Sequence, residues 1–230
     1  MAGTGRRVMT LGPVHLAKVA RAVARTPGDP RYRPLSDDDF SAHAARLVAE
    51  LDGGPFWIFA YGSLIWNPEF EYVDSRRGVV HGWRRSFCIP MTTWRGTPEN
   101  PGLMLGLARG GACTGVAYRM PDDEPYDRML RLLRREVYVH EDIPWLRWVT
   151  VRGGGEQIRA LAFYCAPPDD PDAVLLSLEE QIERLATAVG YKGSCAEYLY
   201  NTVSHLEALG IRDRYLWDLQ ARVAAEIDRL

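Results

Sequence analysis

The segment from Phe56 to Cys165 constrains the fold most, because its residue pattern is that of short strands joined by turns. Its apolar stretches are rich in Val, Ile, Tyr, Trp and Phe and are bounded by Gly, Pro and Asn, which is typical of strands. The expected strands cover residues 56–61, 79–90, 103–109, 113–120, 146–152 and 157–165. Glycine-rich links at 109–112 and 153–155 have the length of hairpin turns, so we expect antiparallel neighbours.

Helical patterns precede, interrupt and follow this strand-rich segment. The expected helices cover residues 14–25, 37–51, 122–138, 175–189, 194–209 and 212–229. The expected N-caps are Ser36, Asp122 and Ser194, and Glu197 follows Ser194 at capping-box spacing. The glycines expected to end helices are Gly190 and Gly210. We therefore expect a β-domain with helices on either side of it in the sequence.

Two stretches of the chain mark its organisation. Residues 1–54 are an N-terminal helical extension, and residues 55–230 form one domain that includes the C-terminal helices. A proline-rich linker at 166–171 connects the β-segment to the helical tail. With 47% of its 230 residues hydrophobic, the chain has enough apolar residues for one well-buried domain.

The charge pattern narrows the class of partner. The formal net charge is −2, and arginines are mixed with Asp and Glu along the chain, so no basic stripe exists for nucleic acid or an anionic membrane. No apolar run approaches the roughly 20 residues of a membrane-spanning helix. We expect a small-molecule partner, no nucleic acid and no membrane, while nothing in the sequence fixes an oligomeric state.

The cysteines and the known cofactor motifs narrow the chemistry. The four cysteines are widely spaced and form no Cys-x-x-Cys pair, so we expect reduced thiols in the cytoplasm. These cysteines are Cys88, Cys113, Cys165 and Cys195. There is no phosphate loop, dinucleotide glycine fingerprint or His-Glu-x-x-His motif, so we expect no cofactor and no metal.

The turn at Gly62-Ser63 is the first candidate for a functional site. An apolar and aromatic run, residues 56–61, breaks there into a glycine-containing turn, at which successive backbone N–H groups can bind developing negative charge. A plain junction between a strand and a turn explains the same residues. The turn by itself leaves both interpretations open.

Glu136 is the second candidate, because it lies near the C-terminal end of an expected helix. The helix dipole places partial negative charge there and favours cations such as Arg134 and Arg135. Glu136 is either a solvated surface residue paired with an arginine or a general base with a raised pKa.

Taken together, six motifs resemble the ChaC-like γ-glutamylcyclotransferases that are specific for glutathione. The resemblance covers about residues 56–215. Its motifs are YGSLIWNP at 61–68, GWRRSFC at 82–88, RGTPENPGLML at 95–105, TGVAYR at 114–119, Arg135-Glu136, and GSCAEYL at 193–199. A single short motif is weak evidence, whereas six in one order over most of a domain are specific.

The resemblance implies an α+β fold, with a small mixed or antiparallel β-barrel flanked by helices. It implies a lyase that needs no cofactor and converts glutathione into 5-oxoproline and cysteinylglycine, with Glu136 as the general acid and base. Tyr61, Gly62, Ser63 and Leu64 match the loop that grips the γ-glutamyl unit. Ser63 is not expected to be a nucleophile, because the substrate amine attacks its own side-chain carbonyl.

The residues that hold the rest of the substrate are less defined. Arg85 or Arg95 would bind the glycyl carboxylate, since the planar guanidinium suits carboxylates. A surface ion pair is the alternative interpretation of either arginine. The chain departs from the family at Ala60, often a second glycine, and at Asp142, where many bacterial relatives carry a tyrosine shortly before a proline. Tyr138 takes over that tyrosine's role, or the pocket has altered preference.

Two alternative functions stay open. The first keeps the chemistry but changes the substrate to another γ-glutamyl amine or dipeptide. The second is a non-catalytic regulatory binding protein on the same scaffold. Residues 1–54 lie outside the resemblance. Their role is that of a lid, a dimer contact or a tether.

Overall fold

The computed structural model describes residues 8–25, 27–166 and 176–230, which fall into two units. The barrel unit contains residues 29–86 and 106–166. The helical unit contains the described residues up to Gly28, residues 87–105 and residues 176–230. Most of the linker expected at 166–171, from residue 167 onward, lies outside the described residues.

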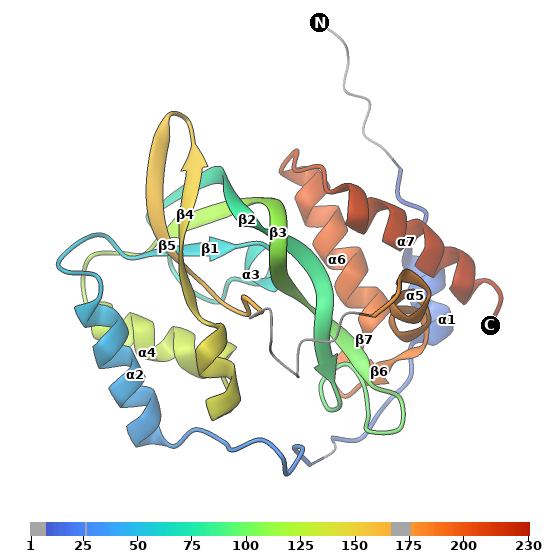
Figure 1. The fold of residues 1–230 in the computed structure, drawn as a ribbon. Coiled ribbons are helices and arrows are strands. Elements are labelled where there is room, and N and C mark those ends of the chain that lie inside the picture. Colours follow the sequence, from blue (N-terminus) through green and yellow to red (C-terminus); the bar gives the residue numbers. More distant parts are fainter. Residues whose placement is uncertain (1–7, 26, 167–175) are drawn as a thin grey trace, which may run out of the picture. The chain divides into compact units, whose positions relative to one another are not determined.

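The barrel is formed by five strands (Figure 1). They are β1 (Trp57–Ala60), β2 (Asp74–Met91), β3 (Gly102–Arg119), β4 (Arg147–Gly153) and β5 (Glu156–Ala162). The strand order β1-β3-β2-β4-β5 closes on itself. β1 is antiparallel to β3, β4 is antiparallel to β2 and β5, and β1 meets β5 in parallel at Ile58 and Leu161. The expected small mixed barrel is confirmed.

The core of the barrel explains the apolar run of β1. All four residues of this strand are buried, as expected for a strand covered on both faces. Among the fully buried side chains of the barrel unit are Ile58, Phe59, Leu107 and Leu161. A buried β1 gives the turn after it a fixed starting point.

One of the two predicted hairpins is wrong. Residues 109–112 do not turn, because β3 runs through them as one strand, with Gly110 at φ +90° and Gly111 at φ +72°. Glycine adopts these left-handed values at no steric cost, so the strand bends without ending. The hairpin at 153–155 is confirmed, since Gly153 pairs with Glu156 across β4 and β5.

The helices of the barrel unit are α2 (Asp37–Ala49), α3 (Ser63–Trp66) and α4 (Pro125–Glu136), followed by the 3₁₀ helix η1 (His140–Trp145). Ser36 caps α2 as predicted, because its side chain accepts from the amide of Asp39. Asp122 is not the cap of α4: its carboxylate binds Arg119 at 2.6 Å. The helix begins instead at Pro125, whose fixed φ suits the first helical position.

The helical unit contains the remaining elements. They are α1 (Pro13–Val19), α5 (Leu178–Thr187), β6 (Val189–Gly190), β7 (Gly193–Ser194), α6 (Cys195–Ala208) and α7 (Arg214–Ile227). The expected helix at 14–25 ends early, at Val19, and the three C-terminal helices are confirmed with shorter ends. Among the described residues, no helix is long and apolar enough to span a membrane.

The predicted helix ends of this unit have mixed outcomes. Ser194 caps α6, but the Glu197 carboxylate binds Arg95 at 3.0 Å. Gly210 follows the end of α6 at φ +68°, as predicted. Gly190 does not end a helix: it lies in β6, where a Cβ atom would come within 2.4 Å of the carbonyl oxygen of Trp94. That close approach of two backbones explains the glycine.

Candidate active site

Glu136 is the last residue of α4, and its side chain is only 12% exposed. Burial raises the pKa of its carboxyl to about 7; Arg135 acts in the opposite direction and the nearby Glu69 carboxylate adds to the increase. The Arg135 Nη1 atom lies 3.3 Å from Glu136 Oε1. Glu136 does pair with an arginine, but as a buried carboxyl rather than a solvated surface residue.

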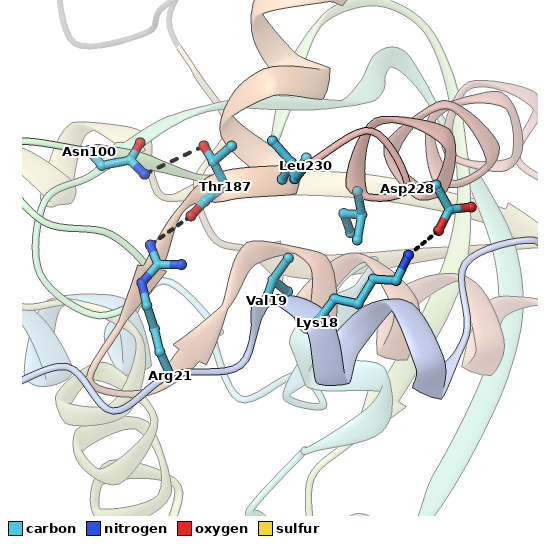
Figure 2. Close-up of a pocket in the computed structure, with 9 residues that line it drawn as sticks. Lys18, Val19, Arg21, Asn100, Thr187, Asp228 and Leu230 are labelled. Atoms are coloured by element: carbon cyan, nitrogen blue, oxygen red, sulfur yellow. Dashed lines mark hydrogen bonds and ion pairs between the residues drawn. The ribbon is translucent and has the colours of Figure 1, made fainter.

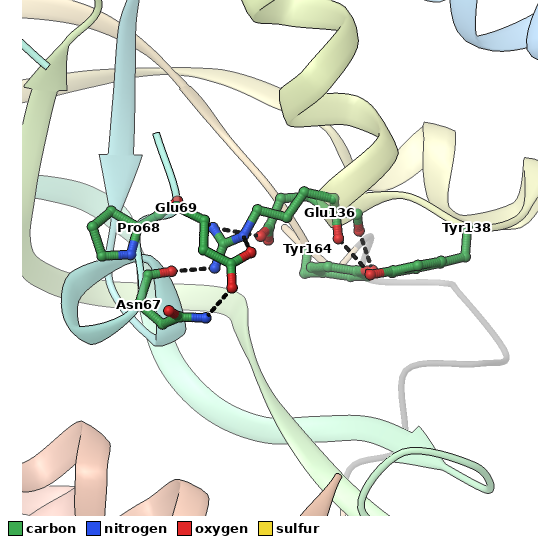
Figure 3. Close-up of polar contacts among 7 residues, drawn as sticks. Asn67, Pro68, Glu69, Glu136, Tyr138 and Tyr164 are labelled. Atoms are coloured by element: carbon green, nitrogen blue, oxygen red, sulfur yellow. Dashed lines mark hydrogen bonds and ion pairs between the residues drawn. The ribbon is translucent and has the colours of Figure 1, made fainter. Parts of the chain in front are cut away.

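Arg135 ties the end of α4 to the segment after α3 (Figure 3). Its guanidinium donates to the carbonyl oxygen of Pro68 at 2.8 Å, to that of Asn67, and to the Glu69 carboxylate at 3.2 Å. Because α3 ends at Trp66, these bonds connect the segment after the glycine turn to the residue beside Glu136.

The predicted turn lies between β1 and α3. Tyr61 and Gly62 connect the two elements, and the amide of Ile65 donates to the carbonyl of Gly62 at 3.0 Å. The first amides of a helix have no partner within the helix, so those of Ser63 and Leu64 are directed away from its hydrogen-bond ladder. Tyr61 is anchored by its hydroxyl, which donates to the carbonyl of Phe163 at 2.8 Å.

Tyr164 connects the same region to Glu136. Its hydroxyl donates to the main-chain carbonyl of Glu136 at 2.5 Å, and its own carbonyl accepts from the amide of Leu107 at 2.9 Å. Its φ of +52° is unusual for a residue other than glycine. Phe163 therefore binds Tyr61 of the turn, and the next residue, Tyr164, binds the end of α4.

Tyr138 comes two residues after Glu136 and is 42% exposed. Its hydroxyl donates to the carbonyl of Arg135 at 2.5 Å, and its amide donates to the Asp142 carboxylate at 3.0 Å. The last two carbonyls of α4, which a helix leaves unpaired, thus accept from two tyrosine hydroxyls, as Figure 3 shows for Tyr138 and Tyr164. Asp142, at the position where the chain departs from the family, holds the main chain after Glu136.

The two candidate arginines lie in different units. Arg85 is only 4% exposed and donates to the carbonyls of Tyr61, at 2.8 Å, and Thr114, at 2.6 Å. It therefore supports the turn from the protein side. Arg95, in the helical unit, binds the carbonyl of Ser194 and the carboxylate of Glu197. Binding of a substrate carboxylate by either arginine stays a prediction.

Sequence reasoning located Glu136 and the turn but missed their supports, Tyr164 and the segment 67–69. These contacts join positions far apart in the chain: 28 residues separate Tyr164 from Glu136, and 67 separate Arg135 from Pro68. The one available signal was Arg135 itself, a cation at the C-terminal end of a helix.

Two cavities contribute no further candidate residue. A cavity of about 450 Å³ in the helical unit is lined by Lys18, Arg21, Asn100, Thr187 and Asp228 together with apolar residues (Figure 2). Its polar groups bind one another, for example Lys18 with Asp228 at 2.7 Å. A cavity of about 460 Å³ in the barrel unit includes Glu69 and Arg135. Neither cavity is lined by Glu136.

Metal-binding residues do not cluster in the described part of the chain. No group of three or more His, Cys, Asp or Glu side chains there is arranged to hold a metal ion. The four cysteines are free thiols, all buried. The expectation of a cofactor-free reaction stays a prediction.

The barrel unit thus combines a closed mixed barrel with a buried carboxyl at a helix end, which Arg135 ties to the segment after the glycine turn and α3. This combination resembles the site of an enzyme. The family model described as ChaC-like protein matches residues 56–226, so the chain belongs to the ChaC-like family. It is 36% identical over 181 residues to the glutathione-specific γ-glutamylcyclotransferase of Escherichia coli K12, covering 78% of each protein. It is 33% identical over 166 residues to the human glutathione-specific γ-glutamylcyclotransferase 1, covering 69% of this chain and 74% of that one.

A solved structure agrees on the fold. The crystal structure of a yeast γ-glutamyl cyclotransferase specific to glutathione matches with a TM-score of 0.63 at 21% identity, over 74% of this chain and 96% of that one. At this identity the likeness establishes the fold alone.

Proposed function

We propose that this protein is a γ-glutamylcyclotransferase that converts glutathione into 5-oxoproline and cysteinylglycine. The observation that carries the proposal is the buried Glu136 carboxyl, with its pKa raised to about 7, at a helix end that Arg135 ties to the segment 67–69 after the Tyr-Gly-Ser-Leu turn and α3. The bacterial and human relatives, both glutathione-specific by name, support the choice of substrate.

Glu136 is the proton carrier of the proposed reaction. Its carboxylate accepts a proton from the α-ammonium group of the γ-glutamyl unit, and the freed amine attacks the γ-carbonyl carbon to close a five-membered ring. After the attack the ring nitrogen still carries two protons. The protonated carboxyl donates its proton to the cysteinyl nitrogen as the bond between that nitrogen and the γ-carbon breaks. The regenerated carboxylate accepts the second proton from the ring nitrogen, and this proton passes to the released amine of cysteinylglycine. A pKa of about 7 keeps both forms of the carboxyl available near neutral pH.

The turn supplies the second part of the mechanism. The amides of Ser63 and Leu64, at the start of α3, would donate to the oxyanion of the tetrahedral intermediate, with Tyr61 and Gly62 shaping the turn. Arg85 holds the carbonyl of Tyr61, so the turn keeps its shape as charge develops. Losing one oxyanion donor typically costs about 3 kcal/mol of transition-state stabilisation.

Asp142 favours a second candidate substrate. This carboxylate, at a position where the resemblance implies a tyrosine in many bacterial relatives, binds the main-chain amides of Tyr138 and Val139 in the loop after Glu136. Another γ-glutamyl amine or dipeptide is the alternative. A non-catalytic binder has less support, since a buried carboxyl at the negative end of a helix dipole destabilises a fold that does not use it.

The cytoplasmic location expected from the sequence is also proposed here. Its support is the set of four free and buried cysteines, which suits a reducing compartment.

The decisive test compares the purified wild-type protein with Glu136→Gln and with a control, Glu183→Gln, which changes an exposed glutamate of α5. Each is incubated with reduced glutathione, and 5-oxoproline and cysteinylglycine are quantified. Release of both products by the wild type and the control, but not by Glu136→Gln, supports the proposal. A folded wild type that releases neither product from glutathione but cyclises a γ-glutamyl amine points to the alternative substrate.

A further inference from the structure

The part of the N-terminal extension in the barrel unit lies beside the residues after Glu136. This part begins at Asp29 and includes α2, and it precedes the family match, which begins at residue 56. Figure 1 shows α2 packed along α4, the helix that ends in Glu136. The extension therefore adds contacts to α4 that involve residues outside the family match.

The contact continues as main-chain pairing. Pro34 and Val139 form an antiparallel bridge. On either side of it, the amide of Leu35 donates to the carbonyl of Tyr138 at 3.2 Å, and the amide of His140 donates to the carbonyl of Arg33 at 2.9 Å. The extension thus pairs with three consecutive residues that begin two positions after Glu136.

Charged side chains reinforce this pairing. Glu141 accepts from the Arg33 amide at 3.0 Å and from Arg33 Nε at 3.3 Å. Asp39 Oδ2 lies 3.3 Å from His140 Nε2. Two residues before Glu136, Arg134 binds the Asp37 carboxylate at 2.7 Å. The extension consequently contacts the chain both before and after Glu136.

The loop that the extension contacts, residues 137–142, sets the position of the Glu136 main chain and side chain. Glu136 ends its helix, so the path of its main chain depends on the loop that begins at Val137. Within the loop, Tyr138 caps the carbonyl of Arg135, and Asp142 binds the amides of Tyr138 and Val139. Further main-chain partners of Tyr138 and His140 come from the extension. A shift of about 1 Å at a reacting group can reduce a rate by about 10²-fold.

We infer that residues 33–39 are a positioning element for Glu136, which hold the loop 137–142 in place. The inference rests on the proposed function and goes beyond it, because it gives one described part of the N-terminal extension, residues 33–39, a role in the reaction. These residues act through the loop and do not touch the reacting atoms. The side-chain bonds at Glu141 and the main-chain bond at Leu35 can be removed separately, so each provides an independent test of the inference.

The test uses two variants of the full-length protein. Leu35→Pro removes the amide that donates to Tyr138, and Glu141→Ala removes the acceptor for Arg33. Arg46→Ala is the matched control, since Arg46 is an extension arginine that pairs with Glu50 of the extension at 2.5 Å. Far-ultraviolet circular dichroism and thermal melting confirm folding, so that either variant can carry the test if the other fails to fold.

The kinetic expectation is a change in kcat rather than in KM. In Leu35→Pro and Glu141→Ala, kcat for glutathione falls by about tenfold, within the roughly 10²-fold range for a misplaced group. KM stays within about twofold, because the turn that grips the substrate is untouched. Glu141→Gln, which keeps an acceptor oxygen, recovers most of the loss, and Arg46→Ala matches the wild type.

A readout that needs no substrate separates this inference from the proposed function. Amide hydrogen exchange at His140, which donates to Arg33, should quicken in both variants but not in the control. The pH at which the Glu136 carboxyl titrates, followed by carbon-13 NMR, should fall as the loosened loop admits water. The charged groups near that carboxyl, Arg135 and Glu69, are unchanged in every variant.

The outcomes are then distinct. Unchanged exchange at His140, or faster exchange with an unchanged Glu136 titration and unchanged kcat, overturns the positioning role. If the wild type forms no 5-oxoproline, the proposed function is wrong. Amide hydrogen exchange at His140 and the titration of Glu136 then still test whether the extension positions this carboxyl.

Discussion

Two glutamate–arginine pairs, one in each unit, show how similar contacts serve different ends. Glu136 lies 3.3 Å from Arg135 at the C-terminal end of α4, with its side chain 12% exposed. Glu197 lies 3.0 Å from Arg95 in the first turn of α6, with its side chain 44% exposed. The helix dipole favours a carboxylate at the second position and opposes one at the first. The unfavourable, buried position is the one at which we propose the proton carrier.

Activity should separate the two glutamates most strongly. Glu136→Gln should lower kcat/KM for glutathione by about 10³-fold, within the roughly 10² to 10⁴ that a general acid or base contributes. Glu197→Gln should leave it within about threefold, because the proposed mechanism gives that carboxylate, which binds Arg95, no proton to carry. Formation of 5-oxoproline measures both. Equal losses would remove the contrast between the pairs.

Glu136 should also make the stability of the protein depend on pH. The folded-state pKa of Glu136 lies near 7, above its ordinary 4.5, so ionising this carboxyl costs more in the folded protein than in the unfolded chain. Its favourable contribution is complete below about pH 4.5 and is lost as the pH rises through 7. The wild type should therefore lose about 3 kcal/mol of unfolding free energy over this window relative to Glu136→Gln. Urea denaturation at several pH values measures the difference, and parallel curves for the two proteins would contradict it.

The arginines of the two pairs should differ in their effect on the pH–rate profile. Arg135 lowers the pKa of Glu136, so Arg135→Met should move the acidic limb of kcat/KM to higher pH. The same change also frees the carbonyls of Asn67 and Pro68, so the rate at the optimum should fall as well. Arg95→Met makes the same substitution in the other pair and should leave the limb where it is. A shift in both variants would point to a general charge effect.

The two tyrosines that cap α4 should differ in their effect on stability. Tyr164→Phe leaves the Glu136 carbonyl without its hydroxyl donor, in the part-buried bond that Tyr164 makes, and should cost about 1 to 3 kcal/mol. Tyr138 is 42% exposed, so water replaces its hydroxyl in Tyr138→Phe and the cost should stay below about 1 kcal/mol. Chemical denaturation of both variants at pH 6 tests the order, and a reversed order would place the support of the helix end at Tyr138.

The same contrast explains what the sequence could reveal. Glu136 and the turn were predictable, because each belongs to a contiguous motif whose chemistry shows in its own residues. The supporting roles of Tyr164 and of the segment 67–69 were not predictable, although Asn67 and Pro68 lie in the first motif, because these roles depend on contacts across the barrel unit. The wrong hairpin at Gly110-Gly111 has a related cause: glycine permits a turn, but the pairing of neighbouring strands decides whether the chain makes one.

The mildest substitution tests whether the turn works through its main chain. Ser63→Ala keeps every backbone amide of α3 and removes only the hydroxyl, so kcat/KM should stay within about threefold of the wild type. A nucleophilic serine would instead lose about 10⁶-fold on the same change, as in serine proteases. The contrast with Glu136→Gln under identical conditions makes the assignment sharp. A large loss in Ser63→Ala would indicate that Ser63 attacks the substrate as a nucleophile. Glu136 would then serve as the base that activates Ser63, and the roles proposed for the turn and for Glu136 would be wrong.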